Sequence, residues 1–240
     1  MDFYDQVVLP RLCDLAMRNQ RLRPYRERVI GAAKGRVLEI GAGSGLNLAL
    51  YGSWVIEVIA LEPDPKLVQM ARRRATQSSK KITFVKASAE AIPLDVGSVD
   101  CVVTTWTLCT IANVPGALEE MRRVLRPDGK LLFVEHGLAP EPTVRKWQNR
   151  LTPLRARFSG GCHLDRPIKD LIQSAGFQIE HLDTDYLPGP KIMTYLYEGS
   201  ARPRCRGAER DPTLDLVSEG QVYRGSGHRS RINKTTVLSR

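Results

Sequence analysis

The chain has 240 residues, 42% of them hydrophobic, so it can bury one sizeable core, and two full domains would be cramped. It has no apolar run of the roughly 18 residues that a transmembrane helix needs, and its N-terminus does not read as a signal peptide. We therefore expect a cytoplasmic protein without stable membrane insertion. Transient membrane contact through an N-terminal helix stays compatible with the sequence.

The formal net charge of +10 raises the question of an anionic partner such as nucleic acid. Residues 202–240 hold nine Lys or Arg and four Asp or Glu, and therefore half of the excess. The same stretch has few large apolar residues and no sustained period, which predicts a basic, disordered tail. Because residues 1–201 carry only the other half of the net positive charge, a nucleic-acid partner is not favoured. The sequence does not indicate an oligomeric state.

Five cysteines are widely scattered, and no close pair has the spacing of a zinc site. Their odd number and the position of one of them in a strand-like run favour reduced thiols over disulfides. They are Cys13, Cys101, Cys109, Cys162 and Cys205.

Residues 1–35 show apolar positions at helical spacing, broken by Pro10 and Pro24, and predict a cap of two or three helices. Residues 36–201 form the predicted main domain, in which strand and helix patterns alternate. The expected strands are 35–40, 55–65, 99–111 and 130–137, with one more at the start of residues 82–93. The expected helices are 46–51, 66–77, 116–129 and 167–176.

The C-terminal part of this domain predicts two further features. Residues 138–167 have weak periodicity and are expected to be irregular. Residues 177–187 and 191–201 flank a Leu-Pro-Gly-Pro turn and predict a closing hairpin. The alternation implies a doubly wound α/β fold with a mostly parallel, Rossmann-like sheet of seven strands and an antiparallel C-terminal hairpin.

In such a sheet, ligands bind where strands end at their carboxyl edge. Glu39–Gly45, with the sequence EIGAGSG, follows the first strand, and its glycines permit a tight turn and a close approach of the backbone to a ligand. A dinucleotide fingerprint needs glycine at position 46, where Leu46 stands instead. Glu62, at the end of the second strand, is placed to accept both hydroxyls of a ribose. Together, turn and acid predict a nucleoside site.

Several motifs, in this order, resemble those of the class I S-adenosylmethionine-dependent methyltransferases. They are VLEIGAGSG, ALEPDP, ASAEAIP, SVDCVVTTWTL and RRVLRPDGKLLFVEH, within residues 36–136. A wider likeness over residues 3–201 rests on YDQVVLPRL, EHG with WQNRL, GGCHLDRPI and YLPGPKIMTYLYEG. It resembles bacterial phosphatidylethanolamine or ubiquinone methyltransferase-like proteins and the animal alkyl thiol methyltransferases. The animal enzymes have an apolar N-terminal anchor, which this chain does not show.

The resemblance implies S-adenosyl-L-methionine as cofactor and a small-molecule acceptor: a thiol, amine, phenol or lipid headgroup. Glu62 would hold the ribose, and Thr105, ending the fourth strand, would face the transferring methyl. Many relatives carry Asp where this chain has Ser88, so the resemblance does not extend to a carboxylate bond to the adenine amine. The implied cofactor-binding residues are Glu39, Gly41, Gly43, Gly45, Glu62, Ala89, Glu90 and Thr105.

Methyl transfer needs alignment in a dry pocket and removal of a proton when the nucleophile carries one. His136, next to Glu135 at the end of the fifth strand, is the first candidate for a catalytic base. On the substrate side we consider Tyr4 and Asp5 in the N-terminal helix, and His163. His163 lies between Cys162 and Asp165, but further ligands are not evident and no metal is expected.

Two other classes of function stay open. One is a non-catalytic nucleoside-cofactor or nucleic-acid-binding module that uses the basic tail. The other is a nicotinamide-dependent oxidoreductase, which Leu46 disfavours.

Overall fold

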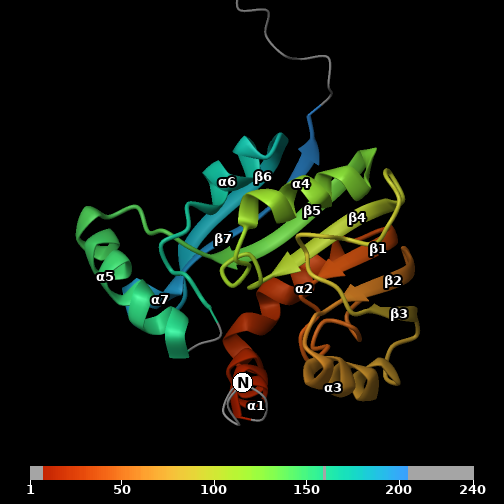
Figure 1. Ribbon diagram of the computed structural model, residues 1–240, viewed down its shortest axis with the longest axis horizontal. Helices are drawn as coiled ribbons and strands as arrows, with labels where there is room; N and C mark the ends of the chain where they lie inside the picture. Colours follow the sequence, from red (N-terminus) through yellow and green to blue (C-terminus); the bar gives the residue numbers. More distant parts are fainter. Residues whose placement is uncertain (1–7, 159–160, 205–240) are drawn as a thin grey trace, which may run out of the picture. The chain divides into compact units, whose positions relative to one another are not determined.

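The computed structural model describes residues 8–158 and 161–204, with side chains left out at 154–158 (Figure 1). Tyr4, Asp5 and most of the predicted tail lie outside the described residues. Seven strands form a single sheet in the order β3-β2-β1-β4-β5-β7-β6. The strands are β1 (Gly35–Ile40), β2 (Val55–Leu61), β3 (Lys81–Val85), β4 (Val99–Thr105), β5 (Leu125–His136), β6 (Phe177–Tyr186) and β7 (Tyr195–Pro203).

The first five strands run parallel, while β7 is antiparallel to both β5 and β6. This topology confirms the predicted mostly parallel sheet with an antiparallel C-terminal hairpin. Helices accompany the strands along the chain. They are α1 (Leu9–Met17), the 3₁₀ turn η2 (Gln20–Leu22), α2 (Arg23–Gly31), α3 (Pro65–Ala75), α4 (Val114–Val124), α5 (Pro142–Phe158), α6 (Ile168–Ser174) and α7 (Lys191–Thr194).

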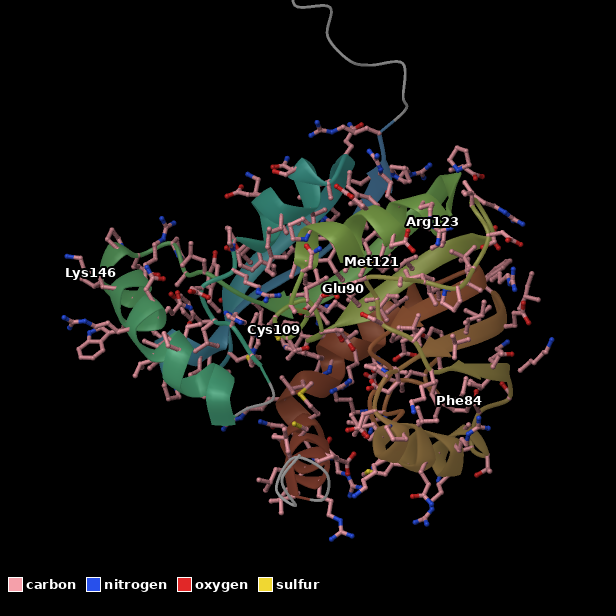
Figure 2. All side chains as sticks on the ribbon, in the orientation of Figure 1. Phe84, Glu90, Cys109, Met121, Arg123 and Lys146 are labelled. Atoms are coloured by element: carbon pink, nitrogen blue, oxygen red, sulfur yellow. The ribbon has the colours of Figure 1, made fainter. Side chains whose placement is uncertain are left out.

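Two apolar layers sandwich the sheet, because successive strand residues point to opposite faces. In β1, Val37 joins the layer that also holds Ile30 of α2, whereas Leu38 joins the layer that holds Met121 of α4 and Ile172 of α6. Figures 1 and 2 show α4 and α6 side by side over one face, with Met121 on α4. Burial on both faces explains why the central strands are continuous apolar runs.

One predicted helix is absent: residues 46–51, expected to be helical, form consecutive turns. Their backbone bonds are short-range, from the N–H of Leu48 to the carbonyl of Gly45 and from that of Leu50 to that of Asn47. Gly52 follows at once, so the segment is too short to repay helix nucleation. The side chain of Asn47 is also held by Glu39 and Thr105.

Residues 138–167, expected to be irregular, contain the 17-residue helix α5. Residues outside the helix hold it in place. The buried Gln148 of α5 accepts a hydrogen bond from the N–H of Ala139 and donates to the carbonyls of Gly137 and Ile192. Tertiary contacts therefore override the weak periodicity and the internal Pro153.

Two element ends also differ from the prediction. The helix predicted over residues 116–129 stops at Val124, and β5 begins at Leu125 and includes Pro127 and Gly129. At the C-terminus, β7 includes Arg202 and Pro203, which we had placed in the tail, because Pro203 still pairs with Phe177, the first residue of β6.

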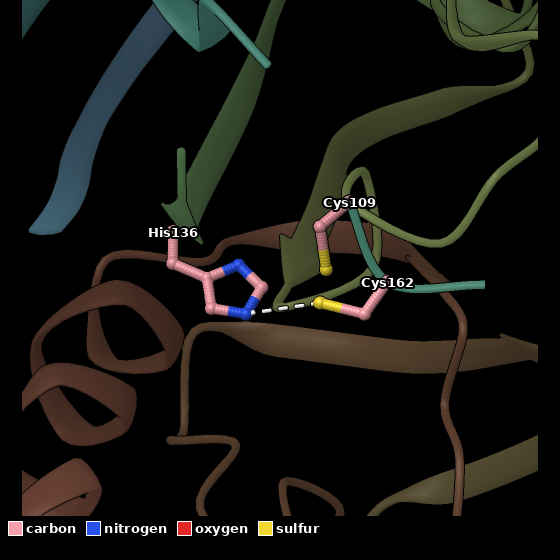
Figure 3. A group of neighbouring side chains, drawn as sticks. All are labelled: Cys109, His136 and Cys162. Carbon is pink, nitrogen blue, oxygen red and sulfur yellow. Dashed lines mark hydrogen bonds between the residues drawn. The ribbon is translucent and has the colours of Figure 1, made fainter. Parts of the chain in front are cut away.

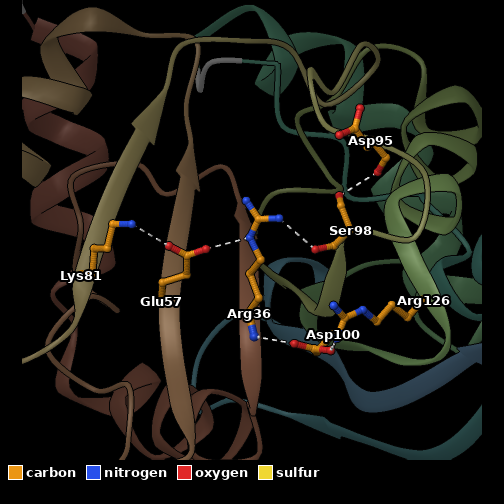
Figure 4. A network of polar contacts seen from close by, with 7 residues as sticks. All are labelled: Arg36, Glu57, Lys81, Asp95, Ser98, Asp100 and Arg126. Atoms are coloured by element: carbon orange, nitrogen blue, oxygen red, sulfur yellow. Dashed lines mark hydrogen bonds and ion pairs between the residues drawn. The ribbon is translucent and has the colours of Figure 1, made fainter.

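The amino edge of the parallel strands carries a polar network (Figure 4). Arg36 of β1 donates from Nε to Glu57 of β2 at 2.8 Å and from its backbone N–H to Asp100 of β4 at 2.7 Å. Lys81 of β3 pairs with the other oxygen of Glu57 at 3.2 Å, and Arg126 pairs with Asp100. These partly exposed pairs link neighbouring strands at the amino edge. Ligands of such sheets bind at the opposite, carboxyl edge, where we therefore look for a site.

Candidate functional site

The glycine turn after β1 lies at the carboxyl edge of the sheet. Gly41, Gly43 and Gly45 have φ values of +65°, +55° and +82°, a region that side chains other than glycine rarely adopt. A Cβ on Gly41 would lie 2.4 Å from the side chain of Thr107, and one on Gly45 would lie 2.8 Å from the backbone of Ala71 in α3. At Gly43 the nearest atom would be 3.8 Å away. The turn is thus packed at both ends and open in the middle.

Glu62 follows β2 and lies against this turn. Its side chain is 6% exposed, and it accepts hydrogen bonds from the N–H of Gly43 at 2.9 Å and from that of Asp64 at 3.0 Å. Burial raises the pKa of Glu62, although these bonds oppose the rise. Each carboxylate oxygen has a further lone pair, so Glu62 retains the capacity to accept ribose hydroxyls beside the open middle of the turn. A nucleoside cofactor fits these residues.

Beneath the turn, Glu39 of β1 is 1% exposed, and both of its oxygens are engaged. Asn47 donates to one at 2.8 Å and the hydroxyl of Tyr51 to the other at 2.9 Å. Asn47 also donates to Oγ1 of Thr105 at 3.0 Å and accepts from Arg26 of α2 at 2.8 Å. Glu39 and Thr105, predicted to touch the cofactor, are therefore joined through Asn47, which the sequence analysis did not single out.

The raised pKa of Glu39 predicts a pH dependence of stability. Burial is the main cause and raises this pKa from 4.5 to about 7. Between these two values the folded chain holds a proton that the unfolded chain has released, so the free energy of unfolding falls as pH rises through the window. The loss due to this group is roughly 3 kcal/mol and is complete above about pH 7.

Urea titrations from pH 4.5 to 8 on wild type and Glu39→Gln test this prediction. We expect a shallower decline in the variant, because Gln has no proton to lose. Part of the slope should remain, since burial also raises the pKa of Glu135 to about 7. Equal slopes in the two proteins would show that Glu39 is ionised in the folded chain throughout the range.

Helix α1 is attached to the turn by its one buried acid, Asp14. Asp14 accepts from Oγ of Ser44 at 2.5 Å and pairs with Arg74 of α3 at 2.7 Å, while Arg74 also donates to the carbonyl of Ser44 at 2.7 Å. Burial opposes ionisation of Asp14, yet these bonds outweigh it and lower its pKa. Helix α1 is thus held against the glycine turn.

Of the predicted adenine-side residues after β3, Ala89 is buried in the core layer beneath α4. Glu90 is exposed and accepts from the N–H of Asn113 at 2.7 Å (labelled in Figure 2). Both lie in the loop that follows the strand next to β2, and so at the same edge as Glu62.

The ends of β4 and β5 are adjacent, with Thr105 opposite Val134. Trp106, directly after β4, has φ +51°, and Arg26 stacks on its ring at 4.8 Å. Glu135 is fully buried and accepts from the N–H of Thr107 at 3.0 Å, so its carboxylate shapes the loop after β4. Glu135 therefore supports the loop after β4.

His136, which ends β5, is half-buried, and its Nε2 lies 3.3 Å from Sγ of Cys162 (Figure 3). Burial lowers the pKa of His136, but Cys162 and Glu135 outweigh it and raise the pKa above the usual value. Cys109, in the loop after β4, completes a cluster in which the ligand atoms of the three residues lie within 4.8 Å of one another. The sequence analysis did not connect these residues, which are far apart in the chain.

His163 is not a member of this cluster. Its side chain is 40% exposed and its Nδ1 lies 3.8 Å from Asp165, while its backbone N–H donates to the carbonyl of Cys109 at 2.8 Å. It therefore holds the 161–165 segment against the loop after β4. None of the four cysteines that the structure describes is in a disulfide bond.

Comparisons with known proteins place the chain among the methyltransferases. Residues 38–133 match a family model described as a methyltransferase domain. Human thiol S-methyltransferase TMT1B is 34% identical over 176 residues, which cover 67% of this chain and 70% of the human protein. The demethylmenaquinone methyltransferase of Clavibacter sepedonicus is 29% identical over 134 residues, 55% of this chain and 54% of that protein.

Among solved structures, the YcgJ protein of Bacillus subtilis superposes with a TM-score of 0.63 at 17% identity, covering 77% of this chain and 98% of its own, which supports the fold. No helix within residues 8–158 and 161–204 is long and apolar enough to cross a membrane. With its strand order, its glycine turn beside Glu62 and its similarity to TMT1B, the chain belongs to the class I S-adenosylmethionine-dependent methyltransferases.

Proposed function

We propose that the protein transfers the methyl group of S-adenosyl-L-methionine to the sulfur of a small thiol. The extent of the match to the thiol S-methyltransferases carries the proposal: at 176 residues it is longer than the 38–133 segment of the family model. It therefore continues into parts of the chain beyond the cofactor residues. Matches to the demethylmenaquinone methyltransferases span 134 and 130 residues.

The residues divide the work as follows. Gly43 leaves open space for the cofactor, and Glu62 accepts its ribose hydroxyls. Thr105, oriented by Asn47, borders the methionyl end, and Ala89 and Glu90 border the adenine. When bound, the cofactor supplies an electrophilic methyl on a sulfonium, so the protein mainly has to align the acceptor and exclude water.

The acceptor must lose its thiol proton for its sulfur to attack well, because the thiolate is the nucleophile. His136, the histidine at the carboxyl edge of β5, is proposed to assist removal of this thiol proton. The new carbon–sulfur bond forms from the thiolate lone pair. The cofactor would supply the methyl group: its sulfonium sulfur would keep the electron pair of the broken carbon–sulfur bond, and it would leave as S-adenosylhomocysteine.

Two measurements test the function. Calorimetry is expected to show binding of S-adenosylmethionine and S-adenosylhomocysteine and no comparable binding of NAD. A panel of alkyl thiols, amines, phenols, demethylated quinones and lipid headgroups, scored by release of S-adenosylhomocysteine, is expected to show turnover with thiols. Turnover with quinones or amines and none with thiols would show that the acceptor belongs to that class and not to the thiols. Salt-dependent RNA binding without any turnover would favour a binding module.

A further inference from the structure

Three side chains with metal-binding atoms converge beside the proposed methyl-transfer site (Figure 3). Cys109 comes from the loop after β4, His136 from the end of β5, and Cys162 from the segment that precedes α6. Their Sγ, Nε2 and Sγ atoms all lie within 4.8 Å of one another. Convergence of two thiols and an imidazole from three separate parts of the chain distinguishes the cluster from a lone cysteine.

The position of the cluster links it to the reaction. Cys109 lies four residues after Thr105 and two after Thr107, whose side chain abuts Gly41 of the glycine turn. Cys109 and Cys162 are 1% and 5% exposed, whereas His136 is half-buried. His136 is therefore the member of the cluster with the most exposed surface, and it lies at the carboxyl edge of β5.

The ligand set and its dimensions suit zinc. Zinc binds Cys sulfur at about 2.3 Å and His nitrogen at about 2.0–2.1 Å in a tetrahedron, which places two sulfurs about 3.8 Å apart and sulfur and nitrogen about 3.5 Å apart. The Nε2–Sγ separation of 3.3 Å between His136 and Cys162 is already close to this. Since no pair exceeds 4.8 Å, shifts of about 1 Å would close the site around an ion.

The chemistry of the donors agrees with that geometry. Thiolates and imidazole are preferred zinc ligands, and Nε2 of His136, 3.3 Å from Sγ of Cys162, is the ring nitrogen that lies at the cluster. Nδ1 of His136 is buried and has no hydrogen-bond partner among the described residues, so the polar contact of the ring with Cys162 is made by Nε2.

We propose that Cys109, His136 and Cys162 bind a zinc ion through three protein ligands, leaving the fourth position for the acceptor thiol. The acceptor part of this proposal rests on the proposed function. Zinc sites with three protein ligands and one open position are typical of catalysis. A thiol that enters the fourth position gives up its proton to solvent and is presented as a thiolate, whose sulfur then takes the methyl as described above. The product thioether has no ionisable proton and is a weak ligand, which favours its release.

The first test measures metal binding by the full chain, without cofactor or acceptor. The purified protein is stripped with a chelator and titrated with Zn²⁺ in competition with a chromogenic chelator, and separately with Co²⁺. We expect one tightly bound ion per chain and, with cobalt, a sulfur-to-metal charge-transfer band. Cys109→Ser, Cys162→Ser and His136→Ala should each weaken binding at least about 100-fold, since losing even an outer-shell partner costs 10–100-fold.

Cys101→Ala is the matched control, because Cys101 is also buried but lies within β4, away from the cluster. It should bind zinc like wild type. Thermal unfolding shows whether each variant is folded, and the wild-type stoichiometry and cobalt spectrum keep the test decisive if a cysteine variant is not. Absence of stoichiometric zinc and of a charge-transfer band in the wild type would overturn the proposal. So would a Cys109–Cys162 disulfide that persists in reductant.

Activity then separates the metal site from the function. If the site acts as proposed, chelation abolishes thiol turnover and zinc restores it, while affinity for S-adenosylhomocysteine is unchanged. Thiol turnover that is insensitive to chelation, with His136→Ala recovering at high pH, would identify His136 as a general base and overturn the zinc role. Zinc binding without methylation of any thiol would keep the metal site and contradict the proposed function.

Discussion

Replacing Glu62 by Ala is expected to lower affinity for S-adenosylhomocysteine at least about tenfold, and 100-fold or more if both ribose bonds are lost in full. A hydrogen bond to a charged group contributes roughly 1.5–3 kcal/mol, and 1.4 kcal/mol corresponds to a factor of ten in affinity. The substitution also removes the acceptor of the Gly43 and Asp64 N–H bonds, so the turn loses its fixed shape. Calorimetry with S-adenosylhomocysteine gives the affinity, and thermal unfolding shows whether the fold survives.

Glu57→Ala is the matched control. Glu57 lies on β2, the strand that Glu62 follows, but near the amino edge, where it pairs with Arg36 and Lys81 (Figure 4). These partly exposed pairs should contribute about 1 kcal/mol or less each to stability, and cofactor affinity should not change. If Glu62→Ala binds S-adenosylhomocysteine as tightly as Glu57→Ala does, Glu62 does not hold the ribose.

Alanine at Gly45 is expected to lower the free energy of unfolding by about 2–5 kcal/mol, whereas alanine at Gly43 should lower it by only about 1–2 kcal/mol. Both residues have positive φ, which costs a residue with a side chain about 1–2 kcal/mol. Only at Gly45 does the new Cβ meet backbone, 2.8 Å from Cα of Ala71 in α3, and such overpacking adds about 1–3 kcal/mol. Urea unfolding of the two variants measures the difference.

The same pair of variants tests where the cofactor binds. The space next to Gly43 is open in the structure and is the space that the cofactor is proposed to use. Gly43→Ala should therefore stay folded and lose affinity for S-adenosylhomocysteine. A Gly43→Ala variant that binds like wild type would place the cofactor elsewhere, and equal stability losses in the two variants would contradict the packing at Gly45.

Much of the fold was predictable because its signals are local. Apolar runs of strand length that alternate with amphipathic segments identify a parallel sheet covered on both faces, and β1 to β5 follow this pattern. The predictions failed where stability is supplied from a distance. Helix α5 depends on Gln148 bonding to residues outside the helix, and residues 46–51 stay in turns beside a side chain, Asn47, that is bonded to two strands.

The same contrast between local and distant signals holds for the residues of the candidate site. Gly43 and Glu62 were predicted because a glycine turn and an acid about 20 residues later carry a recognisable spacing, and the structure joins them by a 2.9 Å hydrogen bond. Asp14 and Asn47 were missed. A single acid or amide in an amphipathic or apolar segment could have been noted as a buried polar group in need of partners, but its partners lie too far away in sequence to be named.

By itself, the sequence determined the class of fold and, through the resemblance of its ordered motifs to the methyltransferases, the cofactor. It also predicted the edge of the sheet at which the cofactor should bind, because each of these signals comes from residues close together in the chain. Only the tertiary structure decided that α1 is attached to the glycine turn through Asp14, and that Cys109, His136 and Cys162 meet. The physical reason is the parallel sheet: it brings the carboxyl ends of β4 and β5 together whatever the length of the chain between them. Distances of a few ångströms between such residues have no counterpart in sequence spacing.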